Sequence, residues 1–187
     1  MKKIILASTS PRRQKLLKEM GINFEIIPPE YDEKIEDKHF SDEIIKNIAI
    51  NKAKSVLPKI KEPSLVIGSD TVVIINGIIT GKPKDEQDGF NILKALSGIK
   101  HFVVTSIAII DSETGKIVCE NTKSEIEFNP LSDEDINNYI KNYKPFDKAG
   151  AYGIQELPGN FVKEITGDFD NIVGFPTKTL KKMLETI

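Results

Sequence analysis

The sequence is poor in the residues that build soft-metal sites and covalent cross-links. Among its 187 residues there is one cysteine, Cys119, there are two histidines, His39 and His101, and there is no tryptophan. A single thiol cannot form an internal disulfide, and one cysteine with two histidines is too few for a zinc site. Any metal would therefore be a hard cation bound through oxygen atoms.

Long apolar runs and an excess of one charge are also missing. No segment reaches the roughly 20 apolar residues that cross a membrane. The apolar run near the start, residues 4–7, is too short for a signal peptide. The 26 basic residues nearly balance the 28 acidic ones, so the net charge is −2. That balance gives no electrostatic case for a nucleic-acid or membrane partner, and we expect a cytoplasmic protein that binds neither.

What remains is typical of one mixed α/β domain spanning residues 1–187. The length fits the usual prior of roughly 100–200 residues per domain, and no repeat or linker divides the chain. Apolar patterns predict strands over residues 3–7, 23–27, 65–75, 101–111, 116–128 and 161–165. Helices are predicted over 11–20, 41–57, 85–96 and 132–143, and from 176 onward. Asn76-Gly77 predicts a type I′ hairpin turn, and Ser132 with Asp135 a capping box.

Asp70 interrupts one of the apolar strands, in LVIGSDTVVII. A buried charge costs several kcal/mol unless it is paired, hydrogen-bonded or bound to a metal. GSDT is also good turn chemistry, so an alternative is that Asp70 caps a turn between two strands. Because apolar residues resume at Val72, we favour a carboxylate held in the sheet, as a candidate metal ligand or general base.

Several basic side chains stand where the local structure does not call for them. Arg12 and Arg13 follow the hydroxyls of ASTS in the first turn of a helix, where acidic residues are stabilising. They suit a phosphate receptor, although an exposed basic turn is the plainer alternative. Lys52 lies on an apolar helix stripe, where it either reaches solvent or points into a cleft. Lys82 in TGKP resembles a P-loop lysine, but the glycine spacing is one residue short and proline replaces Ser/Thr.

Carboxylates from separate segments complete the set. Asp32 and Glu33 in YDEK have a solvated surface loop as their alternative interpretation. Together with Asp70, the arginines and the lysines, they are the parts that phosphoryl chemistry needs, namely cationic clamps, a hard divalent ion and an aligned water.

The segments LASTSPRRQKLL, YDE, NKA, GSDTVV, GKP, LSG, DKAGAYGIQ and VGFP, in this order, resemble the Maf family of nucleoside triphosphate pyrophosphatases. The resemblance covers essentially the whole chain. It implies a single Maf-like domain, with a mixed twisted sheet flanked by helices and two lobes with a central cleft. It also implies hydrolysis of a nucleotide to its monophosphate and pyrophosphate with a divalent cation, Mg²⁺, Mn²⁺ or Co²⁺, and a homodimer.

The resemblance assigns roles to individual residues. Asp70 matches the proposed general base, and Glu33 would share the metal with it. The positions that match substrate-binding residues are Ser8, Arg12, Arg13, Lys52, Thr71, Lys82 and Gln155.

Three of these positions, Arg12, Thr71 and Gln155, are similar to the branch that hydrolyses dTTP and UTP. An amide at Gln155 could read the O4 and N3–H edge of a pyrimidine, although a solvated loop glutamine is the alternative. Glu156 departs from the glycine common in that branch. The 7-methyl-GTP branch typically has an aromatic residue, glutamine and glutamate at the three positions.

Two other functions stay open at this point. One is the same chemistry on a modified purine nucleotide such as 7-methyl-GTP. The other is a nucleotide-binding regulator of cell division or septum formation that has no turnover. Asp70 favours an enzyme, because binding alone does not need a general base.

Overall fold

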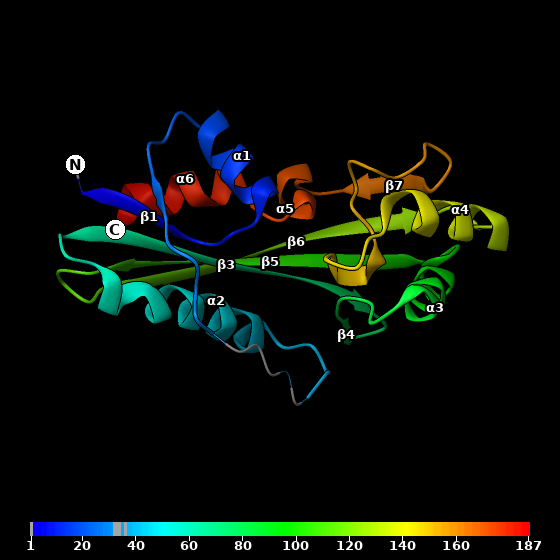
Figure 1. Cartoon of the computed structure of the whole chain (residues 1–187), viewed down its shortest axis with the longest axis horizontal. Coiled ribbons are helices and arrows are strands. Elements are labelled where there is room, and N and C mark those ends of the chain that lie inside the picture. The colour runs from blue at the N-terminus through cyan, green and yellow to red at the C-terminus, as the bar shows by residue number, and fades with distance from the viewer. Residues whose placement is uncertain (1, 32–34, 36) are drawn as a thin grey trace.

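One mixed sheet organises the computed structural model, which describes residues 2–31, 35 and 37–187 (Figure 1). The strands are β1 (Lys3–Ala7), β2 (Glu25–Ile26), β3 (Ser64–Ile75), β4 (Ile78–Thr80), β5 (Lys100–Asp111), β6 (Ile117–Phe128) and β7 (Val162–Thr166). The helices are α1 (Pro11–Glu19), α2 (Asp42–Val56), α3 (Glu86–Leu96), α4 (Asp133–Tyr143), α5 (Phe169–Val173) and α6 (Thr177–Thr186), with 3₁₀ turns η1 (Leu57–Lys59) and η2 (Ala149–Ala151). The strand order is β2-β1-β3-β5-β6-β7, and β4 pairs with β3. The predicted mixed α/β fold is confirmed.

One edge of β3 changes its partner along its length. Parallel β1 pairs with β3 as far as Gly68, which lies opposite Ala7. Antiparallel β4 begins to pair at Val73, opposite Thr80. Among the described residues no strand covers this edge between those two positions. The interruption spans residues 69–72 and therefore includes Asp70.

Helices cover both faces of the sheet around β1 and β3 (Figure 1). Successive side chains of a strand point to opposite faces. Leu6 packs on one face in a cluster that contains Leu17 of α1 and residues of α6. Ile5 and Ala7 pack on the other face with Ala53 of α2. The loop between β1 and α1 and the middle of α2 are thereby fixed at the same stretch of β3.

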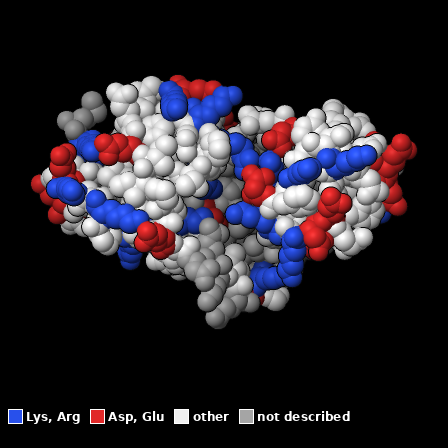
Figure 2. All heavy atoms as spheres, in the orientation of Figure 1, with Lys and Arg blue, Asp and Glu red and all other residues white. Residues whose placement is uncertain are grey.

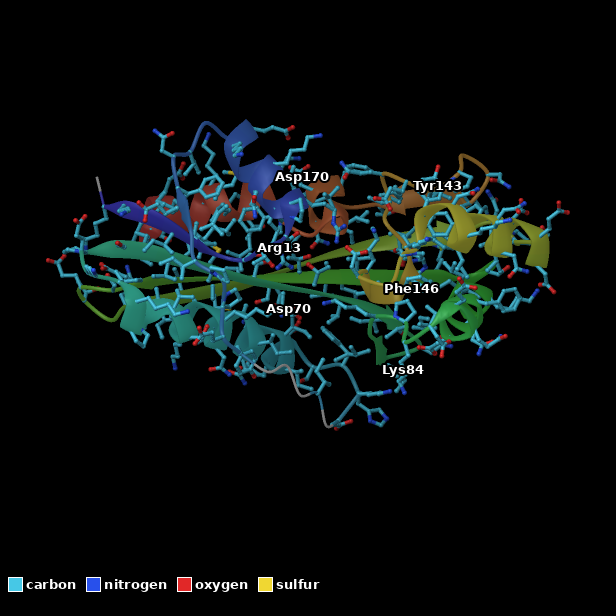
Figure 3. All side chains as sticks on the ribbon, viewed as in Figure 1. Arg13, Asp70, Lys84, Tyr143, Phe146 and Asp170 are labelled. Carbon is cyan, nitrogen blue, oxygen red and sulfur yellow. The ribbon has the colours of Figure 1, made fainter. Side chains whose placement is uncertain are left out.

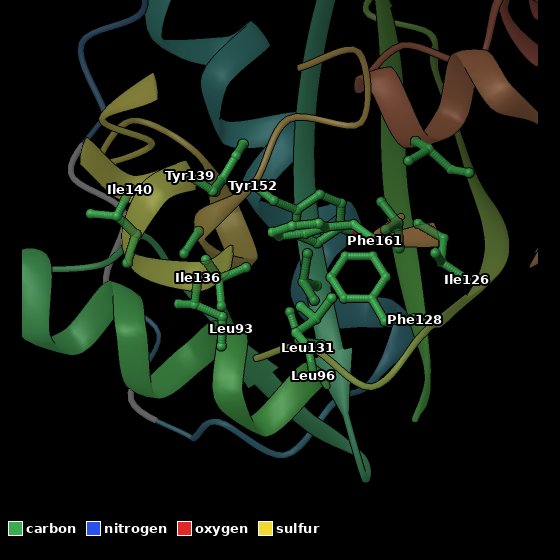
Figure 4. Close-up of a cluster of buried hydrophobic side chains, with 14 residues drawn as sticks. Leu93, Leu96, Ile126, Phe128, Leu131, Ile136, Tyr139, Ile140, Tyr152 and Phe161 are labelled. Atoms are coloured by element: carbon green, nitrogen blue, oxygen red, sulfur yellow. The ribbon is translucent and has the colours of Figure 1, made fainter. Parts of the chain in front are cut away.

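A separate apolar cluster lies at the end of the sheet near α3 and α4 (Figure 4). It contains Leu93 of α3, Phe128 of β6 and Tyr139 of α4, all at most 1% exposed. Ala151 and Tyr152, from the segment after α4, belong to the same cluster. That segment is therefore anchored on a packed core rather than lying loosely over the sheet.

Local signals in the sequence match the structure at several turns and caps. Asn76 and Gly77 have φ angles of 50° and 80°, positive at both positions as a type I′ turn requires. The capping box between Ser132 and Asp135 is present. The strand predicted over 23–27 is shorter, Glu25–Ile26, and α5 and η2 were not predicted. The division into two lobes stays a prediction. None of the described helices combines the length and the hydropathy that crossing a membrane requires.

Candidate active site

A cavity of about 360 Å³ opens beside the interrupted edge of β3. In the view of Figure 2, basic side chains gather around a hollow near the middle of the molecule. Predicted site residues that line the cavity are Arg12, Arg13, Lys52, Asp70, Thr71, Lys82 and Gln155. Ser8 is buried close by, and Glu33 lies outside the described residues. The structure thus brings residues from both halves of the chain to one site.

Asp70 is a strand residue and not a turn residue. It lies within β3, paired with Ser106 of β5, and it is 6% exposed. Its Oδ1 accepts a hydrogen bond from Nζ of Lys52 over 2.6 Å. The turn interpretation of Asp70 is therefore wrong, and so is the interpretation that Lys52 reaches out to solvent. The pairing compensates two charges that would each be costly to bury alone.

Close packing of α2 on β3 makes this ion pair possible. A Cβ at Gly68 would lie 2.2 Å from the backbone oxygen of Ala49 and 2.8 Å from the backbone nitrogen of Ala53. Only a residue without a side chain allows the two backbones to approach so closely. Gly68 lies two residues before Asp70 in β3, and Lys52 lies in the turn of α2 that packs on Gly68. The close approach at Gly68 therefore brings Lys52 within reach of Asp70. Gly68 is thus a structural condition for the Lys52–Asp70 contact.

Arg13 joins three elements around the cavity, and Figure 3 shows it near Asp70 in the middle of the molecule. Its Nε donates to the carbonyl of Gly174 over 3.0 Å, and its Nη1 donates to the carbonyl of Ser69 over 2.9 Å. Its Nη2 donates to Oγ1 of Thr71 over 3.1 Å. Arg13 therefore ties α1 to β3 and to the residue that follows α5. An exposed basic turn does not describe it.

Two hydroxyls predicted to bind substrate take part in the same network. Ser8 Oγ lies 3.4 Å from Nη1 of Arg13 and accepts from the backbone N–H of Ser10. Thr71 Oγ1 is also 3.0 Å from Oγ1 of Thr105. In this arrangement both hydroxyls bind protein groups and help to orient the guanidinium of Arg13.

Buried Asn171 holds α5 in place, and sequence reasoning did not single it out. Its Oδ1 accepts from the backbone N–H of Thr105, and its Nδ2 donates to the carbonyl of Val103 and to Ser124 Oγ. The helix ends at Gly174, with φ 113°, where the carbonyl meets Arg13. A polar side chain at 0% exposure with all these partners is a sign of a positioning role, but no periodic pattern in the sequence marks it.

A second wall of the cavity is formed by the segment 147–156, which carries Lys148. The side chain of Lys148 is 9% exposed, and its Nζ lies 2.8 Å from Asp147 Oδ1 and 3.3 Å from Glu156 Oε2. The other oxygen of Asp147 lies 3.6 Å from Nη1 of Arg12. Lys148 belongs to the motif DKAGAYGIQ, but nothing in the sequence alone gives it a role. Gln155, next to Glu156, is exposed at the same wall.

The direction of the pKa shift of Asp147 agrees with these ion pairs. Burial alone would raise the pKa of Asp147, but the hydrogen bond from Lys148 and the charges of Lys148 and Arg12 bring it below its ordinary value. Behind the wall, Tyr152 Oη lies 2.8 Å from Nε2 of His101. Burial lowers the pKa of His101 to about 4, so this ring is neutral near pH 7. Burial also raises the pKa of Tyr152, which keeps the phenol protonated.

These features define an α/β protein with a cavity in which cations from several elements surround one buried carboxylate. The family model described as "Maf-like protein" matches residues 3–187. The chain belongs to the Maf family.

Individual relatives agree with this assignment. The chain is 45% identical over 184 residues to a protein of Clostridium botulinum (strain Eklund 17B / Type B) named dTTP/UTP pyrophosphatase, covering 98% of both chains. It is 47% identical over 182 residues to a protein of the same name from Clostridium novyi (strain NT), covering 97% of this chain and 95% of the relative. Among solved structures, the Staphylococcus aureus Ham1 protein matches with a TM-score of 0.55 and 15% identity over 99% of each chain. That last likeness shows the fold alone.

Proposed function

We propose that the protein is a nucleoside triphosphate pyrophosphatase that hydrolyses dTTP and UTP to the nucleoside monophosphate and pyrophosphate. The observation that carries the proposal is a buried carboxylate, Asp70, in a cavity whose walls present cations from several separate elements. Relatives that match nearly the full chain bear the name of this activity. Binding of a highly charged anion explains why the walls are cationic in a protein whose net charge is only −2.

In the proposed reaction, Asp70 accepts a proton from the water that attacks the α-phosphorus. The bond from the α-phosphorus to the bridging oxygen breaks, and pyrophosphate leaves. Lys52 donates a 2.6 Å hydrogen bond to the carboxylate of Asp70 and so holds the proposed base in position at the cavity wall. Arg12 and Lys82 face the cavity, where they would neutralise the triphosphate.

A divalent cation is part of the proposal, and the chemistry of the donor set fits it. Asp70 offers a hard oxygen ligand at the cavity wall, and Glu33, the second predicted ligand, lies outside the described residues. No group of three acidic, histidine or cysteine side chains gathers as a metal site in residues 2–31, 35 and 37–187. Oxygen atoms of the triphosphate and of water would supply further ligands. When bound, Mg²⁺, Mn²⁺ or Co²⁺ would offset the charge that the phosphate oxygens develop.

Base recognition is assigned to Gln155. Its side chain is exposed at the cavity wall and carries a donor and an acceptor, as the pyrimidine edge requires. The hydroxyl of Thr71 accepts a hydrogen bond from Arg13, so we assign Thr71 to orienting that guanidinium. The cytoplasmic location and the homodimer stay predictions.

A nucleotide panel tests the proposal against its alternatives. The protein is incubated with dTTP, UTP, 7-methyl-GTP and the ordinary purine triphosphates in the presence of Mg²⁺, and pyrophosphate and orthophosphate are measured separately. We expect pyrophosphate from dTTP and UTP at the highest rates. Preference for 7-methyl-GTP would move the assignment to the purine branch, and tight binding without turnover would support the regulator. Orthophosphate as the first product would contradict attack at the α-phosphorus.

A further inference from the structure

The carboxylate of Asp147 bridges two cations at the cavity wall. Its Oδ1 lies 2.8 Å from Nζ of Lys148, and its Oδ2 lies 3.6 Å from Nη1 of Arg12. The two oxygens of this carboxylate thus each face a different cation. A phosphate group between the same side chains would place its oxygens in the same way. The cations come from separate elements, since Arg12 lies in the first turn of α1 and Lys148 precedes η2.

The exposure of the three side chains separates a fixed partner from a movable one. Lys148 is 9% exposed, whereas Asp147 is 66% exposed and Arg12 32%. An ion pair with one partner in solvent contributes little to stability, because water and salt screen it. Asp147 can therefore leave the two cations at a small cost in free energy, while Lys148 stays in the wall.

Glu156 gives Lys148 a second carboxylate that keeps it in place. Its Oε2 is shielded from solvent and lies 3.3 Å from Nζ of Lys148. Gly153 leaves the space for this pair, since a Cβ there would lie 2.9 Å from Cε of Lys148 and 3.0 Å from Oε2 of Glu156. When Asp147 moves away, Lys148 still has a charged partner and its ammonium group is not left buried and uncompensated.

We propose that Arg12 and Lys148 form a phosphate subsite, and that the carboxylate of Asp147 occupies this subsite until a phosphate group of the substrate displaces it. Lys148 is then a further substrate-binding residue, Glu156 a positioning residue, and Asp147 an internal competitor. The substrate class in this inference rests on the proposed function. The lowered pKa of Asp147 is consistent with it, because its carboxylate stays charged and competes as an anion.

Calorimetric titration with inorganic triphosphate tests the subsite without requiring turnover. Asp147→Asn removes the competing charge and keeps the side-chain shape, so we expect the Kd to fall about threefold to tenfold, the range that one or two screened ion pairs allow. Lys148→Met should raise the Kd about tenfold by removing a charge-assisted contact, and Lys148→Arg should stay close to wild type. The gain from Asp147→Asn should shrink in the Lys148→Met background, because the competitor then has lost its closer partner.

The matched control is Asp133→Asn. Asp133 is 65% exposed and pairs with Lys94 over 2.6 Å, but it does not line the cavity. Its substitution should leave the Kd unchanged, and a fall equal to that of Asp147→Asn would reduce the effect to net charge and overturn the proposal.

Two other outcomes would also overturn the proposal. One is a folded Asp147→Asn protein that binds triphosphate no tighter than wild type. The other is a folded Lys148→Met protein with unchanged affinity. Thermal unfolding of each variant reports folding. Absence of pyrophosphate release by the wild-type protein would instead contradict the proposed function while the binding test still decides on the subsite.

Discussion

Arg13 and Lys148 are basic residues on different sides of the cavity, and the contacts described above for them differ in kind. Arg13 is bound by neutral acceptors of the protein, the carbonyls of Ser69 and Gly174 and the hydroxyl of Thr71. Lys148 is bound by carboxylates, one of them well exposed. These hydrogen bonds commit donors of Arg13 to the fold. Carboxylates cancel the charge of Lys148 until an anion exchanges with one of them.

In the sequence both residues are simply basic side chains, but in the structure they have different roles. Both walls present basic side chains to the same cavity, yet Arg13 joins α1, β3 and the end of α5, whereas the pairing of Lys148 can change with little effect on packing. We therefore expect substitutions on the Arg13 side to alter folding and catalysis together, and those on the Lys148 side to alter affinity.

The largest effect should come from Asp70→Asn, between the two walls. Asparagine cannot accept a proton from water, so we expect turnover of dTTP to fall by about 10²–10⁴-fold. The amide can still accept the hydrogen bond of Lys52, and its shape fits the strand. Pyrophosphate release, thermal unfolding and nucleotide binding are measured on the same sample. Near-normal turnover by the folded variant would remove Asp70 from the reaction.

Acid should weaken the core that supports the Lys148 wall. Burial lowers the pKa of His101 from its ordinary 6.5 to about 4. Between these values the unfolded chain binds a proton that the folded chain does not, so the free energy of unfolding falls as the pH drops through this window. The loss should reach about 3 kcal/mol near pH 4. Denaturant titrations of wild type and His101→Gln across pH 4–7 test this, because the variant should lose that part of the slope.

The low pKa of Asp111 affects the free energy of unfolding over a lower pH range than His101 does. The hydrogen bond from Lys2 lowers it to about 2. Its contribution to stability is therefore lost below the ordinary carboxylate pKa, as the pH falls from about 4 towards 2. The two pH ranges can therefore be told apart. If the free energy of unfolding falls equally between pH 6.5 and 4 in wild type and in His101→Gln, His101 does not cause that fall.

Arg13→Ala and Arg12→Ala compare a side chain that joins three elements with its neighbour in α1, whose ion pair reaches Asp147 of the segment 147–156. Arg13→Ala leaves carbonyl and hydroxyl acceptors without their donor, so it should lower the free energy of unfolding by about 2–3 kcal/mol as well as the turnover. Arg12→Ala removes only a long, partly exposed ion pair, so stability should change by less than about 1 kcal/mol while KM rises. Denaturant unfolding and steady-state kinetics on both variants suffice. Equal stability of the two would contradict the role assigned to Arg13.

Gln155→Met should have the narrowest effect, confined to recognition of the base. It removes the donor and acceptor without changing charge, so we expect kcat/KM for dTTP and UTP to fall about tenfold or more. The affinity for inorganic triphosphate, which has no base, should not change. An equal loss for the phosphate probe and for the nucleotides would show that Gln155 does not read the base.

The fold was largely predictable because apolar patterns, caps and turns are local signals. The strand around Asp70, the Asn76-Gly77 turn and the Ser132 cap follow from neighbouring residues, and the structure contains all of them. Helix α5, with five residues, is too short for a helical period to be visible.

The site was predictable where a residue type conflicts with its local pattern. A carboxylate in an apolar strand and a lysine on an apolar helix stripe point to Asp70 and Lys52. Lys148 and Glu156 lie eight residues apart in an irregular segment, so nothing local indicates that they meet. Asn171 likewise depends on its tertiary partners in β5 and β6.

Hydrolysis of dTTP in water enriched in ¹⁸O shows which phosphorus atom the water attacks. Attack of water at the α-phosphorus places the label in the monophosphate, and mass spectrometry of both products locates it. We expect labelled dTMP and unlabelled pyrophosphate from the wild-type protein, at a rate that Asp70→Asn reduces by orders of magnitude. Label in the pyrophosphate, or labelled dTMP formed as fast by Asp70→Asn, would contradict it.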